Sequence, residues 1–157
     1  MTYLTEARID ATMIEVSLSS AQTASQGDFV LFDTIRATGA HGVSVNSSTG
    51  ELSLDTSKQY YVQASIHVDR SSTTSSWRFA WVDSSGNEIS ADDGGYDAEW
   101  TYHASGTKPN TPNATFTAVY QPNPNQVASP IRLKATLLNA SSSILTNTRL
   151  FIVEGKV

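Results

Sequence analysis

Apolar and polar residues alternate along residues 49–68, which is the clearest pattern in the chain. Leu52 and Leu54 alternate with polar residues, a short polar turn follows, and a second alternating run begins at Tyr60 and ends at Val68. Successive side chains of a β-strand point to opposite faces of its sheet, whereas a helix spaces its apolar residues three and four apart. The pattern therefore predicts two strands, each with one buried face and one face in water.

The same period of two, bounded by turn residues, predicts strands along the rest of the chain. We expect strands at residues 12–18, 28–35, 42–45, 51–54, 59–68, 77–81, 114–120, 131–138 and 148–153, and a short one at 100–102. Residues 83–87 have the composition of a turn that closes a hairpin into 88–89. Polar runs at 19–27 and 71–76 predict loops, as do the three prolines within 121–130. Nine or ten short strands with turns at regular spacing indicate an all-β sandwich or jelly roll, one domain over residues 12–157.

Residues 1–11 carry charge without clear alternation, and we expect them to form an arm before the first strand. A second interpretation stays open at this point, because several apolar residues lie three and four apart, the spacing of a short coiled coil. These residues are Leu4, Ala7, Ala11, Ile14 and Leu18. A free helix of two heptads would be marginal in water, which favours the arm.

Composition excludes several classes of function. The chain has no cysteine, so disulfide frameworks, thiol catalysis and cysteine zinc sites are excluded, and synthesis in a cytoplasm is expected. Its net charge is -5 and its ten basic residues are scattered, which argues against nucleic acid as a partner. The first residues lack the apolar run of a secretory signal, and no stretch predicts a membrane-spanning helix.

The order of these features resembles the jelly roll shared by tumour necrosis factor and the globular heads of complement and collagen-associated proteins. In that family a Phe-Asp strand, a short hairpin, a Thr-Gly-x-Phe motif and a Tyr-x-Phe strand follow one another, and the chain closes on an apolar strand. The matching segments here are Phe32-Asp33, residues 41–45, Thr49-Gly50-Glu51-Leu52, Tyr60-Tyr61-Val62 and Leu150-Phe151-Ile152-Val153. The resemblance spans about residues 12–157 and is strongest over 28–68, although Lys58 and Gln59 replace the usual glycine and residues 90–113 have no counterpart. It implies a homotrimer.

Two segments indicate subunit contact independently of the resemblance. Residues 29–32 and 150–153 are apolar on both strand faces. The core can bury only one face of each strand, so the other face has to be shielded from water by some other cover. That cover is either a loop of the same chain or another subunit, and we expect the subunit, because closed cyclic assembly buries such faces. The candidates near a threefold axis are Tyr61, Tyr120 and Phe151.

Candidate chemistry concentrates in one acidic segment. Its carboxylates, Asp92, Asp93, Asp97 and Glu99, either form a solvated acidic loop or bind calcium, which prefers hard oxygen ligands. The aromatic residues Tyr96, Trp100 and Tyr102 would stack on a sugar if they reach the surface, whereas Trp77 and Trp81 fit a core strand. No nucleophile elbow is present, and carboxylate pairs such as Asp83 with Glu88 can be nominated on any sandwich, so we predict no enzyme and no cofactor.

The resemblance, together with an acidic chain that lacks a secretion signal, implies a bacteriophage particle, which assembles inside a cell and acts outside it. A capsid decoration protein is the expected role, displayed on the virion surface and gripping the major capsid protein through arm residues Tyr3, Leu4, Arg8 and Ile9. One alternative is the receptor-binding head of a fibre that presents residues 71–76, 90–113 and 121–130 to a bacterial surface glycan. Another alternative is a bacterial binding module or lyase of sandwich fold.

Overall fold

The computed structural model describes residues 13–37, 42–69, 74–103, 113–123, 126–138 and 142–155. The strands in this part of the chain are β1 (Met13–Ser17), β2 (Gln22–Ala24), β3 (Thr34–Ala37), β4 (Ser44–Asn46), β5 (Glu51–Ser53), β6 (Gln59–Asp69), β7 (Thr74–Val82), β8 (Gly95–Tyr96), β9 (Ala98–His103), β10 (Asn113–Tyr120), β11 (Arg132–Leu138), β12 (Ser142–Ile144) and β13 (Arg149–Gly155). A single 3-10 turn, η1 (Ala91–Asp93), accompanies them there. In the same part, no helix is long and apolar enough to cross a membrane.

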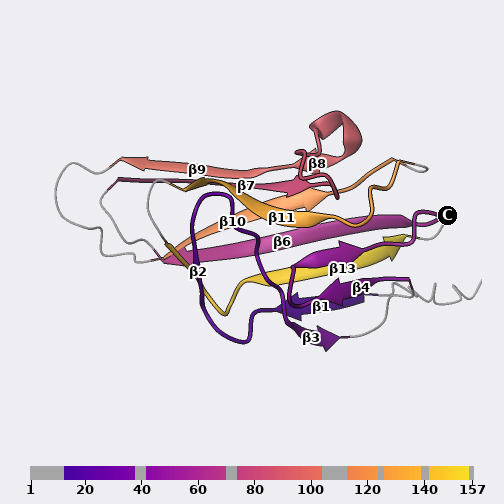
Figure 1. Cartoon of the computed structure of the whole chain (residues 1–157), viewed down its shortest axis with the longest axis horizontal. Helices are drawn as coiled ribbons and strands as arrows, with labels where there is room; N and C mark the ends of the chain where they lie inside the picture. The colour runs from indigo at the N-terminus through magenta and orange to yellow at the C-terminus, as the bar shows by residue number, and fades with distance from the viewer. Residues whose placement is uncertain are drawn as a thin grey trace, which may run out of the picture.

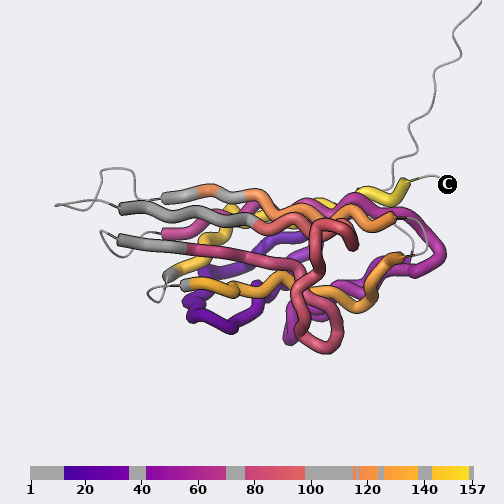
Figure 2. The backbone as a smooth tube through the Cα atoms, turned by 90° about the horizontal axis from the view of Figure 1, so that it is seen from above, coloured from indigo at the N-terminus to yellow at the C-terminus, as the bar shows by residue number. Residues whose placement is uncertain are grey.

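The strands form two antiparallel layers (Figure 1). The larger sheet has eight strands, and β6 lies at its centre. β10 pairs with one side of β6, and β13 and β12 pair with its other side. The smaller sheet has the order β11-β7-β9, and the β4-β5 hairpin joins it through the bridge from Leu52 to Ile131. Seen from above, the long strands of both layers follow the longest axis of the molecule (Figure 2).

The core lies between the two sheets and is supplied by the alternating residues of the strands. In β6 every second residue from Tyr60 to Val68 is buried, as the sequence pattern predicts. Trp77, Phe79 and Trp81 of β7 enter the same core from the smaller sheet and are fully shielded from solvent. The expected all-β sandwich and the core positions of both tryptophans are therefore confirmed.

The expected strand over residues 28–35 is wrong for its first half, because this segment crosses from one sheet to the other. The Val30 N–H donates to the Leu133 carbonyl of the smaller sheet, whereas the Asp33 N–H donates to the Ser17 carbonyl of the larger one. Regular pairing begins only at Thr34, where β3 lies beside β1. Close packing fixes the crossing, since a Cβ on Gly50 would lie 2.5 Å from the Val30 carbonyl oxygen.

Three short strands fall where no strand was predicted. β2 lies inside the expected loop 19–27 and pairs with β12, and β8 adds two residues to the edge of β10. These strands are two or three residues long and largely polar, too short to show a period of two. The hairpin over 83–88 is confirmed: the Asp83 N–H donates to the Asn87 carbonyl, and Val82 bridges to Glu88.

Candidate subunit interface

The outward face of the larger sheet is formed by the residues that alternate with its core. Because directly opposed residues of antiparallel strands share a face, the strand registers continue the outward positions of β6 across the sheet. One row of opposed residues consists of Met13, Val153 and Tyr61. A second row consists of Glu15, Phe151, Gln63, Val119 and Tyr96. Five strands thus contribute to one continuous surface.

Six of these residues are apolar or aromatic, and we call them the apolar stripe: Met13, Tyr61, Tyr96, Val119, Phe151 and Val153. Met13 is 42% exposed, Tyr61 37% and Tyr96 52%, and the other three are partly buried. Along β6 the face then becomes polar, with Ser65 and His67. An apolar patch with a polar rim is typical of a surface that contacts another molecule.

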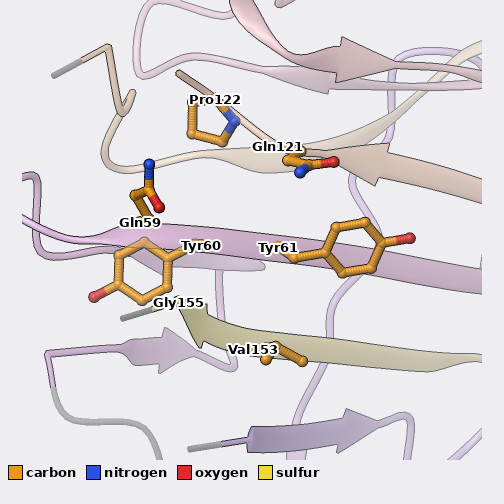
Figure 3. Close-up of a pocket in the computed structure, with 7 residues that line it drawn as sticks. All are labelled: Gln59, Tyr60, Tyr61, Gln121, Pro122, Val153 and Gly155. Atoms are coloured by element: carbon orange, nitrogen blue, oxygen red, sulfur yellow. The ribbon is translucent and has the colours of Figure 1, made fainter. Parts of the chain in front are cut away.

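A shallow hollow of about 160 Å³ lies at one end of the stripe. Figure 3 shows Tyr61 of β6, Val153 of β13 and Gln121, which follows β10, on the neighbouring strands that border it. Tyr61 is oriented along the sheet by its hydroxyl, which donates to the Gln63 side-chain oxygen at 3.0 Å. The hollow gives the stripe a recess into which a complementary side chain can insert.

Two charged side chains on this face, Glu15 and Arg149, pair with each other. Arg149 Nε lies 3.2 Å from the Glu15 carboxylate, and the Arg149 guanidinium also donates to the Thr146 carbonyl at 2.6 Å. Thr115 Oγ1 and His67 Nδ1 are 3.0 Å apart. Burial, together with the nearby Arg149 charge, lowers the pKa of His67, which favours its neutral imidazole. Covering the face would therefore leave no unpaired charge from these groups, which keeps the cost of desolvation low.

The structure separates the three predicted interface residues. Tyr61 and Phe151 both lie on the apolar stripe. Tyr120, in contrast, is 0% exposed: its ring packs in the core and its hydroxyl accepts a hydrogen bond from the Ala128 N–H at 2.7 Å. Burial raises the pKa of Tyr120. Its proposed place at a subunit contact is wrong, because the chain's own core encloses the side chain.

The two doubly apolar segments also differ. In residues 29–32 the side chains of Val30 and Phe32 are buried, and the ring of Phe29 lies under the Arg132 guanidinium, 3.9 Å from ring centroid to Cζ. The same chain therefore supplies a cover for this segment. In residues 150–153 the outward side chains are Phe151 and Val153, both in the apolar stripe, so this segment is the one that offers a face to a partner.

The described carboxylates of the acidic segment, Asp92, Asp93 and Asp97, do not gather at one point. Asp92 and Asp93 are exposed on η1, where Asp93 accepts a hydrogen bond from Ser90 Oγ at 2.8 Å. Asp97 forms an ion pair with Arg78, which also binds Glu88 in a bidentate pair at 3.0 and 2.6 Å. The hydrogen bonds to Glu88 and then to Asp97 raise the pKa of Arg78. No group of three or more potential metal ligands is found within the described residues. The Glu99 side chain lies outside the described part of the chain.

Of the aromatic residues considered for sugar binding, Tyr96 is exposed and belongs to the apolar stripe. Trp100 and Tyr102 lie on β9, where their backbones pair with Trp77 and Ser75, and their side chains are outside the described part. The arm residues Tyr3, Leu4, Arg8 and Ile9 also lie outside it. The strand registers add Met13, Val119 and Val153 to the predicted surface. For Val119 and Val153, the alternation within β10 and β13 is a sequence signal that could have placed them on the outward face.

Comparison with solved structures identifies the architecture. Murine APRIL matches with a TM-score of 0.60 at 11% identity, over 92% of this chain and 99% of that one. The Eiger TNF of S. frugiperda matches with a TM-score of 0.61 at 12% identity, over 93% of this chain and 92% of that one. The fold is the tumour necrosis factor-like jelly roll. The resemblance read from the sequence is thereby confirmed.

The jelly roll of this chain is also similar to a viral protein. The vertex protein P5 of phage PRD1 matches with a TM-score of 0.50 at 15% identity, over 94% of this chain and 96% of that one. No family model and no curated protein matches the sequence. At such low identities the similarity establishes the fold, and function has to be argued from the surface.

Proposed function

We propose that this chain is a structural protein of a bacteriophage particle, displayed on the particle surface as a homotrimer that decorates the capsid. The apolar stripe is the observation that carries the proposal, because it leaves three large hydrophobic side chains, Met13, Tyr61 and Tyr96, exposed on one sheet face. The similarity to the PRD1 vertex protein supports the viral setting. The proposal assigns the chain no catalytic role.

Cyclic assembly about a threefold axis accounts for the asymmetry between the two sheets. The outward face of the smaller sheet carries partly buried polar residues, among them Arg78, Lys134 and Thr136, and can remain in water. The outward face of the larger sheet carries the stripe, and packing three copies of it around an axis removes it from water in a closed assembly. We place Tyr61, Phe151, Met13 and Val153 in this contact.

Decoration adds a second contact, through residues 1–11. Tyr3, Leu4, Arg8 and Ile9 would bind the major capsid protein, and three arms per trimer would bind the shell with higher avidity than one. Deletion of residues 1–11 is expected to abolish co-sedimentation with undecorated capsids and to leave the trimer intact. Unchanged capsid occupancy by the deletion variant would contradict the gripping role.

A charged substitution within the stripe tests the subunit contact. Tyr61→Glu is expected to give monomers, because three carboxylates would meet in a water-poor contact. The matched control is Ile35→Glu, at a residue that is 51% exposed but lies opposite Val16, a core position, and not on the stripe. Analytical ultracentrifugation distinguishes the two variants. If both remained trimeric, or if both dissociated, the stripe would not be the subunit contact.

Exposed Tyr96 favours one alternative role, a receptor-binding head that recognises a bacterial surface glycan. Aromatic rings at a surface bind sugars by stacking on their apolar faces. A glycan array with reproducible hits that Tyr96→Ala removes, together with no binding to capsids, would replace the decoration role by this alternative.

A further inference from the structure

A cavity of about 540 Å³ lies at the edge of the smaller sheet, and none of its lining residues belongs to the apolar stripe. It is open to solvent on one side and is bordered by the segment that crosses between the sheets, by the turn before β5 and by the first residue of β11. Its polar and aromatic groups come from Thr23, Asp28, Phe29, Ser48, Thr49 and Arg132. This volume lies within the range of small-ligand sites in proteins.

One hydroxyl in the wall of this cavity has no hydrogen-bond partner in the described part of the chain. Thr49 Oγ1 is buried and makes no hydrogen bond to any described residue. The turn around it is rigid, because the Thr49 and Gly50 N–H groups both donate to the Asn46 carbonyl, at 3.3 and 2.8 Å. A buried hydroxyl without a partner destabilises a fold, so its retention at a cavity wall points to a bound ligand.

The cations beside the cavity also have no acidic partner among the residues that the structure describes. Arg132 lies 3.9 Å from the centroid of the Phe29 ring and Lys134 lies 6.0 Å from it. Neither cation belongs to an ion pair within the described residues. Asp28 is the acidic residue in the cavity wall, and its carboxylate accepts the Ser25 N–H at 2.8 Å. Within the cavity wall the charges of Arg132 and Asp28 balance, and Lys134 adds one positive charge beside the wall.

The aromatic wall is fixed in position before any ligand arrives. The Gln22 side-chain amide donates to the Phe29 carbonyl at 2.6 Å, and its oxygen accepts the Leu31 N–H at 3.0 Å. These two bonds hold the backbone on both sides of Val30, which is itself bonded to β11. A wall that needs no reorganisation retains more of the binding free energy.

We propose that this cavity binds a carboxylated sugar, as found in acidic polysaccharides. The planar guanidinium of Arg132 matches a carboxylate in geometry and charge. The hydroxyls of Thr23, Ser48 and Thr49 match the ring hydroxyls of a sugar, and Phe29 with Leu31 provides an apolar wall for the C–H face of the ring. The inference goes beyond the proposed function and does not depend on it, since one chain forms the whole cavity.

The test titrates the full chain with methyl glucuronide, methyl glucoside and inorganic phosphate, followed by calorimetry and by chemical-shift changes at concentrations up to about 20 mM. We expect methyl glucuronide to bind at least about tenfold more tightly than the other two compounds, since it alone has both the carboxylate and the ring hydroxyls. Arg132→Met is expected to weaken glucuronide binding by about tenfold or more, and Thr49→Val by several-fold.

The matched control is Lys58→Met, which removes one positive charge away from the cavity, where Lys58 pairs with Glu154 at 2.8 Å. It is expected to bind the glucuronide as the wild type does. Thr49→Val is also expected to be at least as stable as the wild type in thermal unfolding, since it removes a buried unpaired hydroxyl. Absence of glucuronide binding, equal binding of phosphate or glucoside, or an equal loss in Lys58→Met and Arg132→Met would overturn the proposal.

Discussion

The Tyr120 hydroxyl is predicted to stabilise the fold and to have no part in assembly. Its oxygen accepts the Ala128 N–H at 2.7 Å and so joins the end of β10 to the loop before β11. Tyr120→Phe keeps the ring in the core and removes this acceptor. The perturbation therefore isolates one buried hydrogen bond.

The size of the effect follows from the donor that is left behind. A buried N–H that loses its partner costs about 1–3 kcal/mol, and Ala128 is only partly buried, so we expect a loss of about 1–2 kcal/mol. For a domain of this size, that loss lowers Tm by roughly 3–6 °C. The mass of the assembly in solution should not change.

Urea unfolding followed by circular dichroism measures the loss, at one fixed protein concentration because assembly makes stability concentration-dependent. The matched control is Tyr61→Phe, which removes an exposed hydroxyl bonded to Gln63 and should stay within about 0.5 kcal/mol of the wild type. The reasoning would be refuted by wild-type stability in Tyr120→Phe, or by dissociation of the assembly in that variant.

Further predictions concern a turn, a pH dependence and an ion-pair cluster. Gly50→Ala should lower the free energy of unfolding in urea by about 2 kcal/mol or more, since φ is +71° and the new Cβ would meet the Val30 carbonyl. The control Gly86→Ala, with φ +86° and open space around it, should lower it by about 1 kcal/mol. The hydrogen bond from the Asn87 N–H lowers the pKa of the Asp83 carboxyl below 3.8. The ionised carboxylate therefore stabilises the fold above its unfolded pKa, and this stabilisation is lost as pH falls through its folded pKa. Asp83→Asn should accordingly reduce the dependence of stability on pH below about pH 4, as measured by urea unfolding at several pH values. Arg78→Met should destabilise by about 1 kcal/mol in low salt and by less in high salt, as measured by thermal unfolding.

The strands that could be predicted from the sequence are those that bury one face and expose the other. The alternation in β6 is confirmed position by position, because burial of every second residue leaves a direct trace in the order of amino acids. The crossing segment at residues 28–33 was misjudged, since a strand that leaves one sheet for the other is buried on both sides, as a central strand is. Strands of two or three residues, such as β8, leave too few positions to show any period.

The candidate interface could be predicted only in part for a similar reason. Alternation shows which residues of one strand share a face, so Tyr61 and Phe151 could be named from the sequence. Which residues of different strands lie beside each other depends on the register, and that brought Met13 and Val119 onto the surface. Tyr120 was misplaced because it is aromatic like Tyr61, and only the sandwich geometry assigns it to the inner face.

The mass of the purified chain in solution at micromolar concentration is the most direct test of the central claim, that three copies cover the apolar stripe. Sedimentation equilibrium should give three times the chain mass of 16.9 kDa, and Tyr61→Glu should reduce it to that of a single chain. A wild-type chain that sediments as a monomer at this concentration would contradict the account.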